Sequence, residues 1–129
     1  MTLLYERTLA DFFIRGDDAI ACVYLFGSVA RGEAKANSDI DLAVLYRNGP
    51  PPGFDALGIP LAGELERLLG KRVDVVVMNS APVDLIHRIL RDGILVFERD
   101  KSARVRFEVL ARSKYFDLKP ILDRYRRTV

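Results

Sequence analysis

Two short stretches of the chain combine residues that could bind phosphate and a divalent cation. The first is Gly27-Ser28 with Arg31-Gly32 close behind, and the second is Ser38-Asp39-Ile40-Asp41. A strand that runs into Gly-Ser and then a helix offers unpaired backbone N–H groups, and the helix dipole favours an anion there. Two carboxylates at positions i and i+2 of a strand share one face, where they repel unless a cation neutralises them. The pattern predicts a site for a nucleoside triphosphate and a divalent metal ion.

Each stretch by itself also has an ordinary structural explanation. A Gly-Ser pair after a strand is commonly only a turn with an N-cap, and an Asp-x-Asp pair can lie on a solvent-facing strand. Arg31 could reach a phosphate or lie at the surface. Mg²⁺ takes oxygen ligands and is commonly held by one or two carboxylates plus substrate phosphates, so a metal would account for Asp39 and Asp41 together.

A third carboxylate, Asp74, interrupts a valine-rich run over residues 72–78. We expect this run to be a central strand, so that Asp74 is buried and needs a partner, because an unpaired buried carboxylate is strongly destabilising. Arg72, two residues away, could be that partner. A metal or general-base role beside Asp39 and Asp41 would serve equally well, and spacing alone does not choose between the two.

Alternating helices and strands are predicted to position these residues. Apolar residues at helical spacing predict helices, and the short, almost wholly apolar run at 20–26 is typical of a strand buried on both faces. We expect helices over residues 2–15, 28–33, 57–69, 82–92 and 102–126, with a possible break near Pro120, and strands over 20–26, 39–46, 72–78 and 94–98. The order predicts an α/β or α+β fold with a sheet of about four strands and helices packed on it.

Length and composition indicate one ordinary globular domain. The chain has 129 residues, of which half are hydrophobic, and we expect a single domain over residues 1–129 in the cytoplasm, with no membrane span and no signal peptide. The lone cysteine, Cys22, lies in an apolar run and is interpreted as a core residue. The lone histidine, His87, lies beside Ile86 and Ile89 and is interpreted as structural or exposed rather than catalytic.

The charge is unevenly distributed. Residues 99–129 carry ten Lys or Arg against four Asp or Glu, a balance of +6, whereas residues 1–98 have a balance of −4. A basic helical tail, about residues 100–129, indicates either an acidic partner or a solvated helix face.

The combination of Gly27-Ser28, Arg31-Gly32, Ser38-Asp39-Ile40-Asp41 and Asp74 resembles the DNA polymerase β-like nucleotidyltransferase superfamily. Within it, the Gly-Ser-Val-Ala-Arg-Gly-Glu-Ala run and the small size are similar to the minimal nucleotidyltransferases. The tail segment Tyr115-Phe116-Asp117-Leu118 is similar to the MntA-type antitoxins that pair with HEPN toxins. The resemblance extends from the strand at residue 20 to residue 98, and the motif shows no departure.

The resemblance implies a nucleotidyltransferase fold with a small mixed sheet, and a role for each motif residue. The implied nucleotide-binding residues are Gly27, Ser28, Arg31 and Ser38. The implied catalytic and metal-binding residues are Asp39, Asp41 and Asp74. Asp74 would also help to deprotonate the attacking hydroxyl. ATP would be the substrate, and two Mg²⁺ ions would stabilise the attacking and leaving oxygens.

The resemblance also implies the acceptor and the partner. We expect AMP transfer from ATP to a tyrosine of a partner HEPN ribonuclease toxin, which this AMPylation would neutralise, so the chain would act as an antitoxin in a hetero-oligomer. One alternative acceptor is a small molecule such as an aminoglycoside, and another possibility is a non-catalytic antitoxin that masks its partner. Nucleic-acid binding through the tail is not expected, because Tyr115, Phe116 and Tyr125 fit a helix packing face at least as well.

Overall fold

The computed structural model describes residues 2–33, 38–49 and 59–128. Along the chain the elements are α1 (Thr2–Arg15), β1 (Ile20–Phe26), α2 (Gly27–Ala30), β2 (Ile40–Tyr46), α3 (Ile59–Leu69), β3 (Val73–Val77), the 3₁₀ turn η2 (Met78–Ser80), α4 (Val83–Asp92), β4 (Ile94–Glu98) and α5 (Lys101–Thr128). The predicted strands are confirmed to within one residue at each end. The predicted start of the third helix at residue 57 lies outside the described residues.

The four strands form one mixed sheet in the order β3-β2-β1-β4. Strand β1 is antiparallel to both β2 and β4, and β2 is parallel to β3. The first six residues of β1 are all buried, because helices cover both faces of the sheet. The predicted fold class, a small mixed sheet with helices packed on it, is confirmed.

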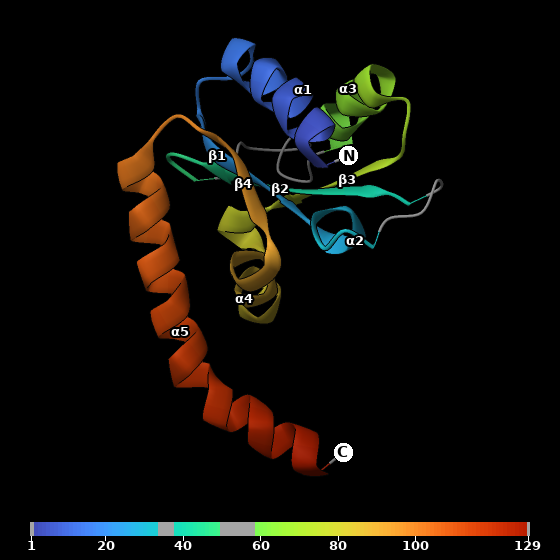
Figure 1. Cartoon of the computed structure of the whole chain (residues 1–129). Coiled ribbons are helices and arrows are strands. Elements are labelled where there is room, and N and C mark those ends of the chain that lie inside the picture. The colour runs from blue at the N-terminus through green and yellow to red at the C-terminus, as the bar shows by residue number, and fades with distance from the viewer. Residues whose placement is uncertain (1, 34–37, 50–58, 129) are drawn as a thin grey trace.

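Two apolar cores occupy the two faces of the sheet. Helices α1 and α3 cover one face and α4 and α5 cover the other (Figure 1). Alternation along β1 divides its side chains between the two layers: Val23 and Leu25 join the core under α1 and α3, whereas Cys22 and Tyr24 join the core under α4 and α5. Cys22 is fully buried, as expected for a core residue.

Strand β3 differs from its prediction in one respect that matters for function. It lies at the edge of the sheet, not in the centre, and Asp74 is exposed. The expectation of a buried Asp74 in need of a partner was therefore wrong. The valine-rich sequence reflects packing of Val73 and Val77 against one core, while the open side of the edge strand gives Asp74 access to water.

Helix α5 is one continuous helix of 28 residues, and Pro120 lies inside it. Figure 1 shows the helix bending in its middle rather than ending, which is how a proline is accommodated in a helix interior. The first half is anchored to the sheet. Arg104 forms ion pairs with Glu98 and Glu108, and the Tyr24 hydroxyl donates to Glu108 at 2.8 Å.

None of the helices in the described residues combines the length and the apolar character that crossing a bilayer requires.

Candidate active site

The predicted site residues meet where β1 ends and β2 and β3 begin. Phe26, the last residue of β1, pairs with Asp41, and Asp41 pairs with Asp74 on the neighbouring parallel strand. Residues in register on adjacent strands point to the same face, so the Asp41 and Asp74 side chains lie side by side. That face is the one covered by α4 and α5, because the flanking Ala43 belongs to their core.

The turn at Gly27 packs directly against Asp41. Gly27 has φ +75°, a conformation that favours glycine, and a Cβ built there would overlap the Asp41 carboxylate, with its Cγ only 3.0 Å away. The site therefore needs glycine at this position for two independent reasons. The four-residue helix α2 starts here and forms a single turn, in which the Arg31 N–H donates to the Gly27 carbonyl at 3.2 Å.

The Ser28 hydroxyl does not serve as a helix cap. The N-cap residue of α2 is Phe26, and no side-chain hydrogen bond caps the helix. The simple explanation of Gly27-Ser28 as an N-capped turn is therefore wrong for this helix. The first amide groups of a helix have no partner within it, and here they lie at the same end of the sheet as Asp41. The start of α2 can therefore donate hydrogen bonds to an anion.

The charged groups of the site affect the pKa of Asp41. Burial raises the pKa of Asp41 above its ordinary value, and Asp74 and Asp39 raise this pKa further, whereas Arg31 lowers it. The strand register places Asp41 beside Asp74, and Asp39 lies two residues before Asp41, just ahead of β2. Arg31 is exposed at the rim, where its guanidinium pairs with Glu33 at 3.1 Å.

The site supplies the oxygen ligands and the excess negative charge that Mg²⁺ requires. As the side chains are placed, however, no group of three His, Cys, Asp or Glu residues in the described ranges is arranged to hold one metal ion. Asp41 and Asp74 are fixed by the strand ladder, while Asp39 precedes β2 and is not held by strand pairing. The chemistry of the donors fits a divalent cation.

Ser38 and Asp39 are half-buried at the entrance to β2. The next residue, Ile40, donates its N–H to the Arg72 carbonyl at 2.9 Å, which fastens the start of β2 to the chain just before β3. Strand β2 starts one residue later than predicted. The expectation that Asp39 and Asp41 both lie on the strand therefore holds only for Asp41.

Sequence reasoning missed a fourth carboxylate near this site. Asp92, the last residue of α4, accepts two hydrogen bonds from Arg91, at 3.0 and 2.8 Å. These bonds lower the pKa of Asp92. Ile94, two residues on, pairs with Leu25 near the end of β1, which places Asp92 near the α2 turn. No local motif marks it. Only the pairing of β4 with β1, in which Ile94 opposes Leu25, brings Asp92 to this end of the sheet.

Comparisons with known proteins agree with this geometry. The family model described as Polymerase beta, Nucleotidyltransferase matches residues 8–102. A protein adenylyltransferase MntA of Aphanizomenon flos-aquae is 36% identical over 83 residues, which span 57% of this chain and 54% of that protein. A protein adenylyltransferase MntA of Thermococcus cleftensis is 39% identical over 72 residues, 56% of this chain and 70% of that protein. The chain thus spans about half the length of the first of these relatives.

Solved structures show the same fold. A toxin–antitoxin crystal structure with AMP-PNP contains a chain that superposes with a TM-score of 0.71 at 24% identity, covering 93% of this chain and 97% of that one. A complex of a tri-AMPylated Shewanella oneidensis HEPN toxin with MNT antitoxin gives a TM-score of 0.66 at 23% identity, covering 97% and 98%. The chain belongs to the polymerase β nucleotidyltransferase family, and within it to the MntA-type minimal nucleotidyltransferases.

Proposed function

We propose that the chain is a protein adenylyltransferase antitoxin that transfers AMP from ATP to a tyrosine hydroxyl of a HEPN-type toxin. The observation that carries this function is the pairing of Asp41 with Asp74 on adjacent strands, with the Gly27 turn packed against Asp41. Relatives named protein adenylyltransferase support it, as do structural neighbours that contain AMP-PNP or an AMPylated HEPN toxin.

The residues of the site would share the work of binding and proton transfer. The amide groups of the α2 turn, Ser28, Arg31 and Ser38 would hold the triphosphate, because amide, hydroxyl and guanidinium groups all donate to phosphate oxygens. Asp39, Asp41 and Asp74 would bind Mg²⁺, which supplies positive charge to the attacking and leaving oxygens. Burial and then the charges of Asp74 and Asp39 raise the pKa of Asp41, and a bound cation would stabilise the ionised carboxylate against both.

The transfer needs no covalent enzyme intermediate. The acceptor phenol oxygen forms a bond to the α-phosphorus, the bond from that phosphorus to the bridging oxygen of the β-phosphate breaks, and pyrophosphate leaves with the electron pair. The phenol proton passes to the carboxylate of Asp74, which is exposed and can receive it. The protein would act by positioning and by electrostatic stabilisation.

The test is incubation of the chain with Mg²⁺, ATP labelled at the α-phosphate and the product of a HEPN-type gene from the same genome, taken from the neighbouring position where one is found there. We expect label on that protein, and its loss in the double variant Asp39→Asn, Asp41→Asn. Asp18→Asn is the matched control, because Asp18 is exposed and lies before β1, at the other end of that strand from Gly27. Persistent labelling by the double variant would contradict the assignment of the two aspartates.

The same experiment separates the alternative functions. Label on an added aminoglycoside, with none on the protein, would indicate a small-molecule nucleotidyltransferase. A stable complex in which the toxin is inactive but unlabelled would indicate an antitoxin that acts by masking.

A further inference from the structure

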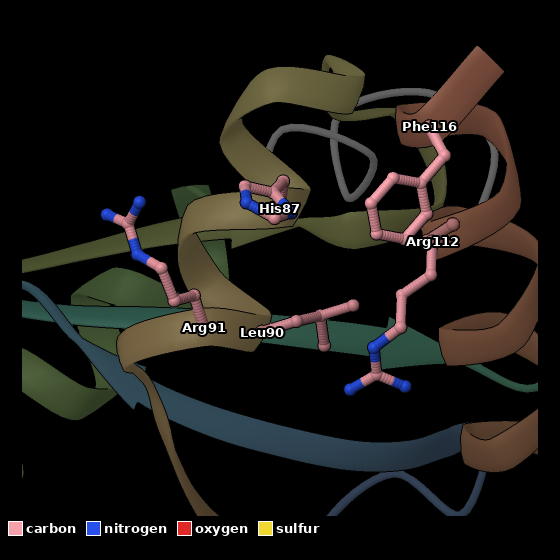
Figure 2. A pocket seen from close by; sticks show the side chains of 6 residues that line it. His87, Leu90, Arg91, Arg112 and Phe116 are labelled. Carbon is pink, nitrogen blue, oxygen red and sulfur yellow. The ribbon is translucent and has the colours of Figure 1, made fainter. Parts of the chain in front are cut away.

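A cavity of about 220 Å³ lies between α4 and α5 and has no part in the proposed transfer chemistry. Its lining residues are His87, Leu90 and Arg91 from α4 and Ala111, Arg112 and Phe116 from α5. In Figure 2 the Leu90 side chain lies between Arg91 on one helix and Arg112 on the other, with the rings of His87 and Phe116 beside it. The cavity is thus an apolar hollow with cationic side chains at its rim.

Aromatic side chains from both helices lie at the cavity. The ring of the lining residue His87 stacks on Tyr115, with centroids 3.6 Å apart and ring planes 1° from parallel, so this contact packs α4 against α5. Phe116, the next residue, is 65% exposed. A large aromatic side chain left this accessible at the edge of a cavity is typical of a surface that binds another molecule.

The two arginines at the rim are not equivalent. Arg91 is engaged by Asp92 through two hydrogen bonds, at 3.0 and 2.8 Å. In the described parts of the chain, no hydrogen bond or ion pair holds the guanidinium of Arg112. Arg112 is therefore available to an anionic group of a bound molecule, in a tail whose balance of charge is +6 over residues 99–129.

The cavity lies close to the candidate active site. The cavity residues Leu90 and Arg91 lie in the last turn of α4. Just after this helix, Ile94 pairs with Leu25, two residues before Gly27. The last turn of α4 therefore lies near the end of β1, on the sheet face that also carries Asp41 and Asp74.

The size of the cavity favours a side chain over a whole nucleotide. Pockets for small molecules usually measure about 300–1,000 Å³, which is more than this cavity offers. We infer that the cavity is a docking subsite for the acceptor protein, which inserts one aromatic or aliphatic side chain between Leu90 and Phe116 and places a nearby carboxylate on Arg112. This docking role rests on the transfer function proposed above, because it names where the acceptor of that reaction binds.

Two variants test the subsite, each with a matched control on the same helix. Phe116→Ala removes the apolar wall, and Val109→Ala is its control, an exposed apolar residue that does not line the cavity. Arg112→Glu reverses the rim charge, and Arg106→Glu is its control, because Arg106 is exposed and also lies outside the lining. Far-UV circular dichroism and thermal unfolding check that each protein is folded, and Arg112→Gln replaces Arg112→Glu if the latter is not.

The first measurement is the Kd for the same HEPN-type protein, by calorimetry without ATP. We expect each cavity variant to raise this Kd about tenfold, a typical cost for an anchoring side chain or a charge partner, while the controls stay within about twofold. The second measurement is transfer kinetics. We expect the KM for the acceptor to rise about as much as the Kd, with the KM for ATP unchanged, since the cavity would bind only the acceptor.

The two proposals fail in different ways. If the wild-type chain binds the protein but labels nothing, the transfer function fails, and the Kd values still decide the subsite. Unchanged Kd values in both cavity variants would overturn the docking role, as would failure of the wild-type chain to bind the protein. A rise in the KM for ATP with normal acceptor binding would identify a nucleotide subsite instead and would also overturn it.

Discussion

Replacing Gly27 by alanine tests whether the α2 turn holds Asp41 in place. Gly27 has φ +75°, and an alanine in this left-handed conformation costs about 1–2 kcal/mol. The added Cβ would also overlap the Asp41 carboxylate, whose Cγ lies 3.0 Å from its position. The carboxylate or the turn must then move, and a displacement of about 1 Å at a reacting centre can lower a rate about a hundredfold.

Gly32 provides a matched control for this substitution. Its φ is +73°, nearly the same as that of Gly27, but a Cβ built there meets no atom of the described residues within 4 Å. Gly32→Ala should therefore carry the same backbone strain without the contact to Asp41. We expect both variants to lose about 1–2 kcal/mol in the free energy of unfolding, with a further loss for Gly27→Ala from the overlap.

Urea denaturation measures these stabilities, and the initial rate of AMP transfer from labelled ATP measures activity. We expect transfer by Gly27→Ala to fall about a hundredfold, while folded Gly32→Ala keeps most of its activity. Equal transfer rates for the two alanine variants would refute the reasoning, because the contact with Asp41 would then be irrelevant to positioning. A wild-type rate in Gly27→Ala would refute it as well.

Three further predictions concern single side chains. Because burial and the neighbouring carboxylates raise the pKa of Asp41 above 3.8, folding stability should fall as pH rises from about 3.8 through the raised value. Asp41→Asn should thus be more stable than wild type by urea denaturation near neutral pH, and a gain of equal size below about pH 3 would contradict this cause. Burial raises the pKa of Cys22 to about 12, so the thiol should resist alkylation at mildly alkaline pH in the native protein and react after unfolding. Mass spectrometry follows the alkylation, and rapid labelling of the native protein would show that the thiol is accessible. The Arg99 guanidinium donates to the carbonyls of Phe13 and Ile14, both at 3.0 Å, at the end of α1. Arg99→Ala should therefore lower the free energy of unfolding, measured by urea denaturation, by about 1–2 kcal/mol. A loss no larger than that of Arg106→Ala would argue against a stabilising role for these two hydrogen bonds.

The strands were predictable because each has a simple local pattern. Residues 20–26 and 94–98 are short, mostly apolar runs next to glycine or charged residues, and the structure places β1 and β4 at these positions. The expected strand position holds for Asp41, whereas Asp39 lies just before β2. Local sequence was sufficient wherever the determining interaction was local.

Features that depend on strand order were not predictable in this way. The valine-rich composition of β3 suggested a central strand, yet the strand is at the edge and Asp74 is exposed. Which strand becomes an edge is set by pairing between distant segments, which leaves no local trace. The register that aligns Asp41 with Asp74 and the approach of Asp92 to the α2 turn are also products of tertiary packing. The continuity of α5 through Pro120 is a fourth example: beyond the proline, Arg126 of this helix pairs with Asp84 of α4 at 2.9 Å, a contact between segments that are distant in the sequence.

The central position of β1 has a consequence for synthesis on the ribosome. One side of β1 pairs with β2, which follows closely in the chain, but the other side pairs with β4 at residues 94–98. A nascent chain that has exposed only β1 and β2 therefore presents an apolar strand with an open edge, the kind of surface on which chains aggregate. Protection of that edge has to wait until residues 94–98 have left the exit tunnel. Chaperone demand during translation should thus be set by the distance between β1 and β4 along the sequence.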